Sequence, residues 1–140
     1  MKNGLMLGVV VLLIVSIVAI SGCTSNSGES NTPPVNVTGI TVQNSGYGSY
    51  HVLGTITPSK DFSYLEIVLK WYDAEGNVIE RSSLAWNTND AKAGESIKFD
   101  AMSFIPEGST PAKFDLLIFD SPFGGGDESD AIYKTTQNLN

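Results

Sequence analysis

The chain has 140 residues, of which 41% are hydrophobic, and its eight Lys and Arg face fifteen Asp and Glu, a net charge of −7 at pH 7. This length accommodates one domain rather than two. Because phosphate binding needs clustered cations, the acidic balance argues against nucleic acid as a partner. A single cysteine excludes an intramolecular disulfide, so the folded part must be stabilised by a hydrophobic core.

The first segment has the three parts of a secretory signal peptide. Met1-Lys2-Asn3 carries one basic side chain, the run LMLGVVVLLIVSIVAI (residues 5–20) has no charge, and Ser21-Gly22 precedes Cys23. Beyond Cys23 the sequence changes abruptly to polar residues. The pattern predicts a leader over residues 1–22 that directs the rest of the chain out of the cytoplasm.

The stretch ISGC (residues 20–23) resembles the lipobox of prokaryotic lipoproteins, in which an aliphatic residue and two small residues precede a cysteine. The resemblance implies that lipid is attached to Cys23, that residues 1–22 are removed, and that the protein is anchored in the cell membrane, facing outside the cytoplasm. An uncleaved signal-anchor helix is the alternative, although the apolar run is slightly shorter than the roughly 20 residues that span a bilayer. A catalytic thiolate would need a polarising pocket, which this leader does not supply.

Residues 23–35 are predicted to form a lipidated, flexible tether, because TSNSGESNTPP (residues 24–34) contains no large apolar residue. Beyond the leader, whose one charged residue is Lys2, seven Lys and Arg face fifteen Asp and Glu, a net charge of −8. We therefore expect the lipid, rather than attraction to anionic headgroups, to hold the protein at the membrane. Asn36 opens the sequon Asn36-Val37-Thr38 and is a candidate glycosylation site if the host glycosylates exported proteins.

Short runs of β-branched and aromatic residues, separated by turn signals, follow the tether. In YLEIVLKWYD (residues 64–73), Leu65, Ile67, Leu69 and Trp71 share one face, a period of two that indicates a strand. The turn at Asp73–Asn77 predicts a hairpin in which Gly76 adopts positive φ. Strands are expected at residues 36–43, 49–57, 64–73, 78–86, 94–104 and 112–120, with a seventh at 131–135.

This spacing predicts an all-β fold, an immunoglobulin-like antiparallel β-sandwich of six to seven strands over residues 36–136, with a tail at 137–140. The immunoglobulin likeness is one of architecture, because the antibody-type Cys-Trp-Cys signature is absent from the sequence. The predicted core consists of Ile40, Val42, Val52, Ile56, Leu65, Ile67, Leu69, Trp71, Val78, Leu84, Ile97, Phe99, Phe114, Leu116 and Ile118.

The region from residue 52 to about residue 118 resembles the FxLYD domain, a small immunoglobulin-like module of bacterial and archaeal envelope proteins. The likeness lies in VLGTI (residues 52–56), LEIVLKWYDAEGNVI (65–79) and AGESIKF (93–99). Tyr72 and Asp73 match the motif that names the family, whereas Leu69 and Trp71 stand where the family usually has Phe and Leu. The resemblance implies the fold and an envelope setting, and it carries over no catalytic residue.

Three groups of polar residues are candidate sites. His51 is the one histidine and lacks a nearby Gly-x-Ser-x-Gly elbow, so an ordinary strand position is expected. Asp73 and Glu75 lie in a solvated turn, where a carboxylate caps the turn more readily than it acts as an acid. The acidic loop DSPFGGGDESD (residues 120–130) lacks the spacing of an EF-hand, and a solvated loop is favoured over a calcium site. No metal or other cofactor is expected.

Aromatic side chains give the clearest indication of a binding role. If Trp71 faces the core, then Tyr72, Trp86 and Phe119 are expected on outer faces or ends, where they can stack on sugars or anchor a protein. The predicted function is a lipid-anchored, extracytoplasmic module with a non-catalytic binding or structural role in the cell envelope, recognising an envelope protein or glycan. The alternative is a small carboxylate-dependent hydrolase at the cell surface.

Overall fold

The structure is a computed structural model that describes residues 33–123 and 127–139. The predicted leader, Cys23 and nearly all of the tether lie outside these residues. The described part contains no helix with the length and hydropathy of a membrane span. Its elements are β1 (Val35–Gly46), β2 (Ser49–Pro58), β3 (Phe62–Tyr72), β4 (Val78–Ala91), β5 (Ile97–Phe104), β6 (Lys113–Phe119), the short 3-10 helix η1 (Glu128–Asp130) and β7 (Tyr133–Asn138).

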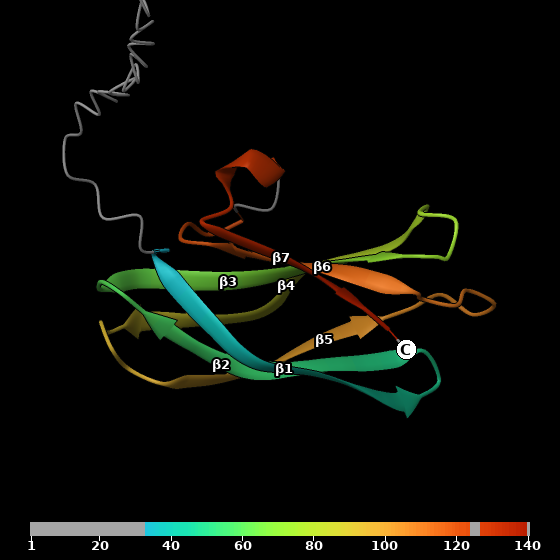
Figure 1. Cartoon of the computed structure of the whole chain (residues 1–140), viewed down its shortest axis with the longest axis horizontal. Coiled ribbons are helices and arrows are strands. Elements are labelled where there is room, and N and C mark those ends of the chain that lie inside the picture. Colours follow the sequence, from blue (N-terminus) through green and yellow to red (C-terminus); the bar gives the residue numbers. More distant parts are fainter. Residues whose placement is uncertain (1–32, 124–126, 140) are drawn as a thin grey trace, which may run out of the picture. The chain divides into compact units, whose positions relative to one another are not determined.

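The strands form two antiparallel sheets that face each other (Figure 1). One sheet has the order β1-β2-β5 and the other has the order β4-β3-β6-β7. All five strand pairings within the sheets are antiparallel. The predicted β-sandwich of six to seven strands is therefore confirmed, with seven strands in the part of the chain that the structure describes.

The core between the sheets follows the predicted face of β3. Leu65, Ile67, Leu69 and Trp71 are all fully buried. The Trp71 ring lies 4.9 Å from Phe114 and 5.3 Å from Tyr50, centroid to centroid. Its Nε1–H donates a 2.8 Å hydrogen bond to the buried Ser103 Oγ on β5, so the one polar atom of the indole is satisfied across the sandwich. The other predicted core residues that are buried are Val52, Ile56, Phe99, Phe114, Leu116 and Ile118, while Ile40, Val42 and Ile97 pack at the margin.

Val78 and Leu84 were wrongly predicted as core residues, since both are about half exposed. Irregular pairing between β3 and β4 explains the two errors. Trp71 pairs with Glu80 but Tyr72 pairs with Val78, so the extra residue places Val78 opposite Tyr72 and on the outer face. A second shift lies between Ile67 and Leu69, and opposite it Leu84 adopts a positive φ of 57° that turns its side chain outward.

The outer face of the four-stranded sheet is itself partly covered. Val68, Leu117 and Phe119 form a second fully buried cluster, against which Ala131 packs. In Figure 1 the segment with η1 lies over this sheet, on the side away from β1, β2 and β5. Phe119 was wrongly expected to be an exposed, partner-binding aromatic, because the chain that follows β6 folds back over it.

The described domain is slightly longer than predicted at both ends. Val35, assigned to the tether, is fully buried and pairs with Pro58. Gln137, assigned to the tail, lies in β7 and pairs with Phe114 of β6. Leu139 N–H donates to the Ala112 carbonyl. Pairing to a neighbouring strand decides both boundaries, because exposed backbone groups at a sheet edge take a partner where one is in reach.

Candidate functional site

The two remaining predicted aromatics, Trp86 and Tyr72, both make contacts within the domain. Trp86 pairs with the inward-facing Ile67, so it faces the interior, and its ring lies 6.1 Å from that of Phe99. Tyr72 lies on the outer face as predicted, but its hydroxyl donates a 2.8 Å hydrogen bond to Asp115, and the ammonium groups of Lys70 and Lys113 lie over its ring. Both rings are therefore partly covered by contacts within the domain.

Tyr72 belongs to a charged cluster on this outer face. The buried Asp115 carboxylate accepts from Tyr72, from Thr136 at 2.6 Å and from Lys134 at 3.1 Å. Glu128 of η1 bridges Lys70 at 2.6 Å and Lys134 at 2.9 Å. These bonds lower the pKa of Glu128 and raise the pKa of Lys70, chiefly through the hydrogen bond that joins the two side chains. The cluster fastens η1 to the sheet, and we assign it to stability.

Asp115 gives this cluster a pH dependence. Burial alone would raise its pKa, but hydrogen bonds from Thr136, Tyr72 and Lys134 outweigh burial and hold the pKa below its ordinary value of 3.8. A carboxyl whose folded pKa is depressed stabilises the fold above the unfolded pKa and loses that contribution as the pH falls through the folded pKa. We expect the free energy of unfolding, measured in urea, to fall below about pH 4. Thr136→Val should reduce this acid dependence, and an unchanged dependence would contradict the assignment.

The polar candidates are likewise engaged in structural contacts. His51 Nδ1 lies 2.7 Å from the Asp100 carboxylate on the neighbouring β5, a cross-strand contact of the kind expected. Asp73 accepts from the backbone and the side chain of Asn77, which closes the predicted hairpin turn. These Asn77 bonds lower the pKa of Asp73.

Within the described residues, the carboxylates of the acidic loop do not converge on a metal site. Asp127 caps η1 by accepting from Ser129 N–H, and Glu128 is held by its lysines. Among residues 33–123 and 127–139, no three His, Cys, Asp or Glu side chains lie close enough to share a metal ion. Asn36 is exposed on β1, where a glycan could be accommodated, and its modification remains a prediction.

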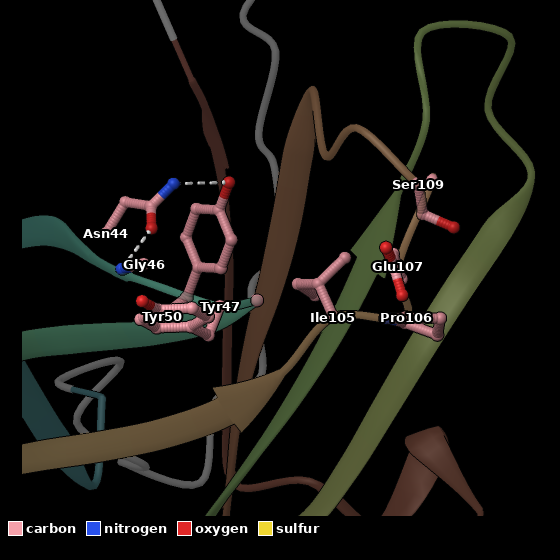
Figure 2. A pocket seen from close by; sticks show the side chains of 10 residues that line it. Asn44, Gly46, Tyr47, Tyr50, Ile105, Pro106, Glu107 and Ser109 are labelled. Carbon is pink, nitrogen blue, oxygen red and sulfur yellow. Dashed lines mark hydrogen bonds between the residues drawn. The ribbon is translucent and has the colours of Figure 1, made fainter.

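The best candidate for a site lies at one end of the sandwich, between the β1–β2 turn and the loop after β5. A hollow of about 450 Å³ opens there, which we call the turn hollow. Figure 2 shows the turn residues on one side of it and the loop residues on the other. The side chains that define it are Asn44, Tyr47, Tyr50, Ile105, Glu107 and Ser109.

A second hollow of about 430 Å³, the edge hollow, adjoins the first. It lies between β1 and the end of β7, and its lining includes Pro111, Gln137 and Asn138. Asn44 and Tyr50 line both hollows. Asn44 Nδ2 donates a 2.9 Å hydrogen bond to the Tyr50 hydroxyl (Figure 2). We call this shared pair the ridge.

Tyr47 is the aromatic that the sequence analysis missed. It lies in the turn between Gly46 and Gly48, its side chain is fully exposed, and its φ is +52°. A large non-glycine residue rarely adopts such a φ, which costs roughly 1–3 kcal/mol. The sequence did hold a signal, because an aromatic between two turn glycines has no strand neighbour to pack against.

The turn around Tyr47 is fixed by hydrogen bonds. Asn44 Oδ1 accepts from Gly46 N–H at 2.8 Å, and Gly48 carbonyl accepts from Ile105 N–H at 2.8 Å. A Cβ on Gly48 would lie 2.4 Å from the Ile105 carbonyl oxygen, so the turn and the loop approach as closely as glycine allows. The arrangement fixes the backbone on both sides of Tyr47 and leaves its ring exposed.

Comparison with known proteins adds little to this geometry. No family model and no curated protein sequence matches the chain, so the resemblance to the FxLYD domain remains a prediction. Among solved structures, a GH3 β-glucosidase of Bifidobacterium adolescentis is 16% identical over 75% of this chain, with a TM-score of 0.40. β-Glucosidase 3B of Thermotoga neapolitana, in complex with glycerol, is 10% identical over 76% of this chain, with a TM-score of 0.37. The chain spans 17% and 16% of those proteins, and likenesses at this level carry no argument about function.

Proposed function

We propose that the protein is a lipid-anchored, extracytoplasmic β-sandwich module that binds a component of the cell envelope and does not catalyse a reaction. The observation that carries this proposal is the composition of the two hollows. Their linings combine tyrosine rings, amides, hydroxyls and aliphatic side chains with a single carboxylate, Glu107. Hydrolysis by carboxylates typically uses a pair of acidic groups, which in glycosidases flank the scissile bond roughly 5–10 Å apart. A lining with one exposed carboxylate favours binding over that chemistry.

The proposed anchor would keep the domain within reach of envelope components. The eleven residues 24–34 span at most roughly 35–40 Å when extended, which suffices to lift a domain clear of lipid headgroups. A net charge of −8 beyond the leader gives no attraction to an anionic surface, so the lipid on Cys23 supplies the attachment.

The anchor gives a direct prediction for Cys23. In the native host, the purified protein should begin at Cys23 and carry lipid mass on that residue. Cys23→Ser should release the protein from the membrane fraction or leave the leader uncleaved, because the thioether cannot form. Mass spectrometry and membrane fractionation measure both results, and a native protein with an intact Met1–Gly22 would favour the signal-anchor alternative.

A second experiment separates a binding module from an enzyme. The full chain, held in detergent micelles, is incubated with envelope glycans and peptides, and both turnover and binding are recorded. We expect saturable binding without turnover. Turnover that disappears with Glu107→Gln and persists in Asp73→Asn would instead identify a hydrolase.

A further inference from the structure

From the two hollows we infer the ligand class: the end of the sandwich binds a neutral oligosaccharide of at least two pyranose units. This inference rests on the proposed binding function and specifies its ligand. Three features carry it, namely the exposed ring of Tyr47, the uncharged polar groups of the linings, and the shared ridge formed by Asn44 and Tyr50.

Tyr47 offers the apolar contact. One face of a pyranose ring presents C–H groups, which pack on the electron-rich face of an aromatic ring. The Tyr47 ring is fully exposed beside the turn hollow, and its backbone is held at positive φ by the hydrogen-bonded turn. A tyrosine side chain has only two χ angles, so it loses little conformational entropy when a ligand packs on its ring.

The polar groups determine the charge of the ligand. Asn44, Ser109, Gln137 and Asn138 provide amide and hydroxyl groups, and Glu107 provides one carboxylate. None of the described residues that line either hollow is Lys, Arg or His. A phosphate or an acidic sugar would lack a cationic partner there and would meet Glu107. Sugar hydroxyls, which both donate and accept, match this mixture of amides and carboxylate.

The ridge indicates the length of the ligand. The Tyr50 oxygen accepts from Asn44, which leaves the hydroxyl proton of Tyr50 for donation to a ligand. Because Tyr50 lines both hollows, a ligand that occupies both of them would meet Tyr50 between its two units. Each hollow falls within the size range of small-molecule sites. Two adjoining hollows therefore favour a disaccharide unit over a single sugar.

The test uses the full chain in detergent micelles and four neutral disaccharides: cellobiose, maltose, mannobiose and N,N′-diacetylchitobiose. Titration calorimetry and aromatic NMR shifts report binding. We expect at least one disaccharide to bind saturably, to shift the Tyr47 and Tyr50 signals, and to bind more tightly than its monosaccharide. Tyr47→Ala should raise the Kd about tenfold, as loss of a central aromatic contact does.

Phe123→Ala is the matched control. Phe123 is also a highly exposed aromatic at positive φ, but it follows β6, and its N–H donates to Glu66 on the outer face of the other sheet. Its removal should leave the Kd unchanged. Equal losses in the two variants would contradict the assignment of Tyr47.

Other results distinguish this inference from the proposed function. The inference of a neutral saccharide ligand would be overturned if none of the four disaccharides bound. It would also be overturned if digalacturonate bound more tightly than the neutral sugars. A photo-crosslinker at position 47 that captures a protein and no glycan would also overturn it, while the proposed binding module would stand. Turnover lost in Glu107→Gln would overturn the proposed function itself.

Discussion

Trp71→Ala should destabilise the domain by about 3–5 kcal/mol, the usual cost of truncating a buried tryptophan. Trp71 is fully buried, lies against the rings of Tyr50 and Phe114, and donates to Ser103. Alanine removes all of these contacts and leaves the Ser103 hydroxyl without its partner. Urea unfolding of the two chains at pH 7, monitored by circular dichroism, measures the difference.

Tyr72→Ala is the neighbouring control for this prediction. Tyr72 occupies the opposite face of β3, where it is half-buried and bonded to Asp115. Its removal costs a hydrogen bond to a charged group and some packing, so we expect a loss of about 1.5–3 kcal/mol. A larger loss for Tyr72 than for Trp71 would mean that the register of β3 is shifted by one residue. The stability loss of Trp71→Phe should lie between those of Tyr72→Ala and Trp71→Ala, because phenylalanine keeps most of the aromatic packing but cannot donate to Ser103.

The inner face of the sandwich was predictable because it depends on local alternation. The sequence from Leu65 to Trp71 repeats with a period of two, and the structure buries each of those apolar residues as that period requires. The turn at Asp73–Asn77 was also predictable, since Asp, Gly and Asn determine its geometry within five residues.

The outer face was not predictable by the same rule, which assumes that one side of a strand is solvated. Val68, Leu117 and Phe119 are buried because the chain after β6 folds back and places Ala131 against them. This contact joins β3 to a segment about sixty residues away in sequence, so no local pattern reports it. The unbroken apolar run at residues 116–119 was the one available hint, because strands buried on both faces read in this way.

The candidate site was missed for a related reason. The sequence predicts exposed aromatics on strands, at Tyr72, Trp86 and Phe119, but other parts of the domain pack against these strand residues and cover them wholly or partly. Tyr47 stands free because it lies in a turn, where no neighbouring strand supplies a surface. The turn hollow also needs residues 105–109 beside the β1–β2 turn, and the edge hollow needs Gln137 and Asn138 beside β1. Only the folded topology brings these distant segments together.

Gly48→Ala should destabilise the domain by about 2–4 kcal/mol, combining the strain of positive φ with overpacking. Gly48 has a φ of +77°, and an added Cβ would lie 2.4 Å from the Ile105 carbonyl oxygen, a backbone atom that moves only with the whole loop. Gly46→Ala is the matched control, because Gly46 has a similar φ of +86° but open space within 4 Å of its Cβ position. It should cost only about 1–2 kcal/mol, the strain alone. Urea unfolding of the two variants measures the difference, and equal losses would show that the turn and the loop after β5 are not held in this close approach. If they are, Gly48→Ala should also weaken ligand binding more than Gly46→Ala, since it separates the two walls of the turn hollow.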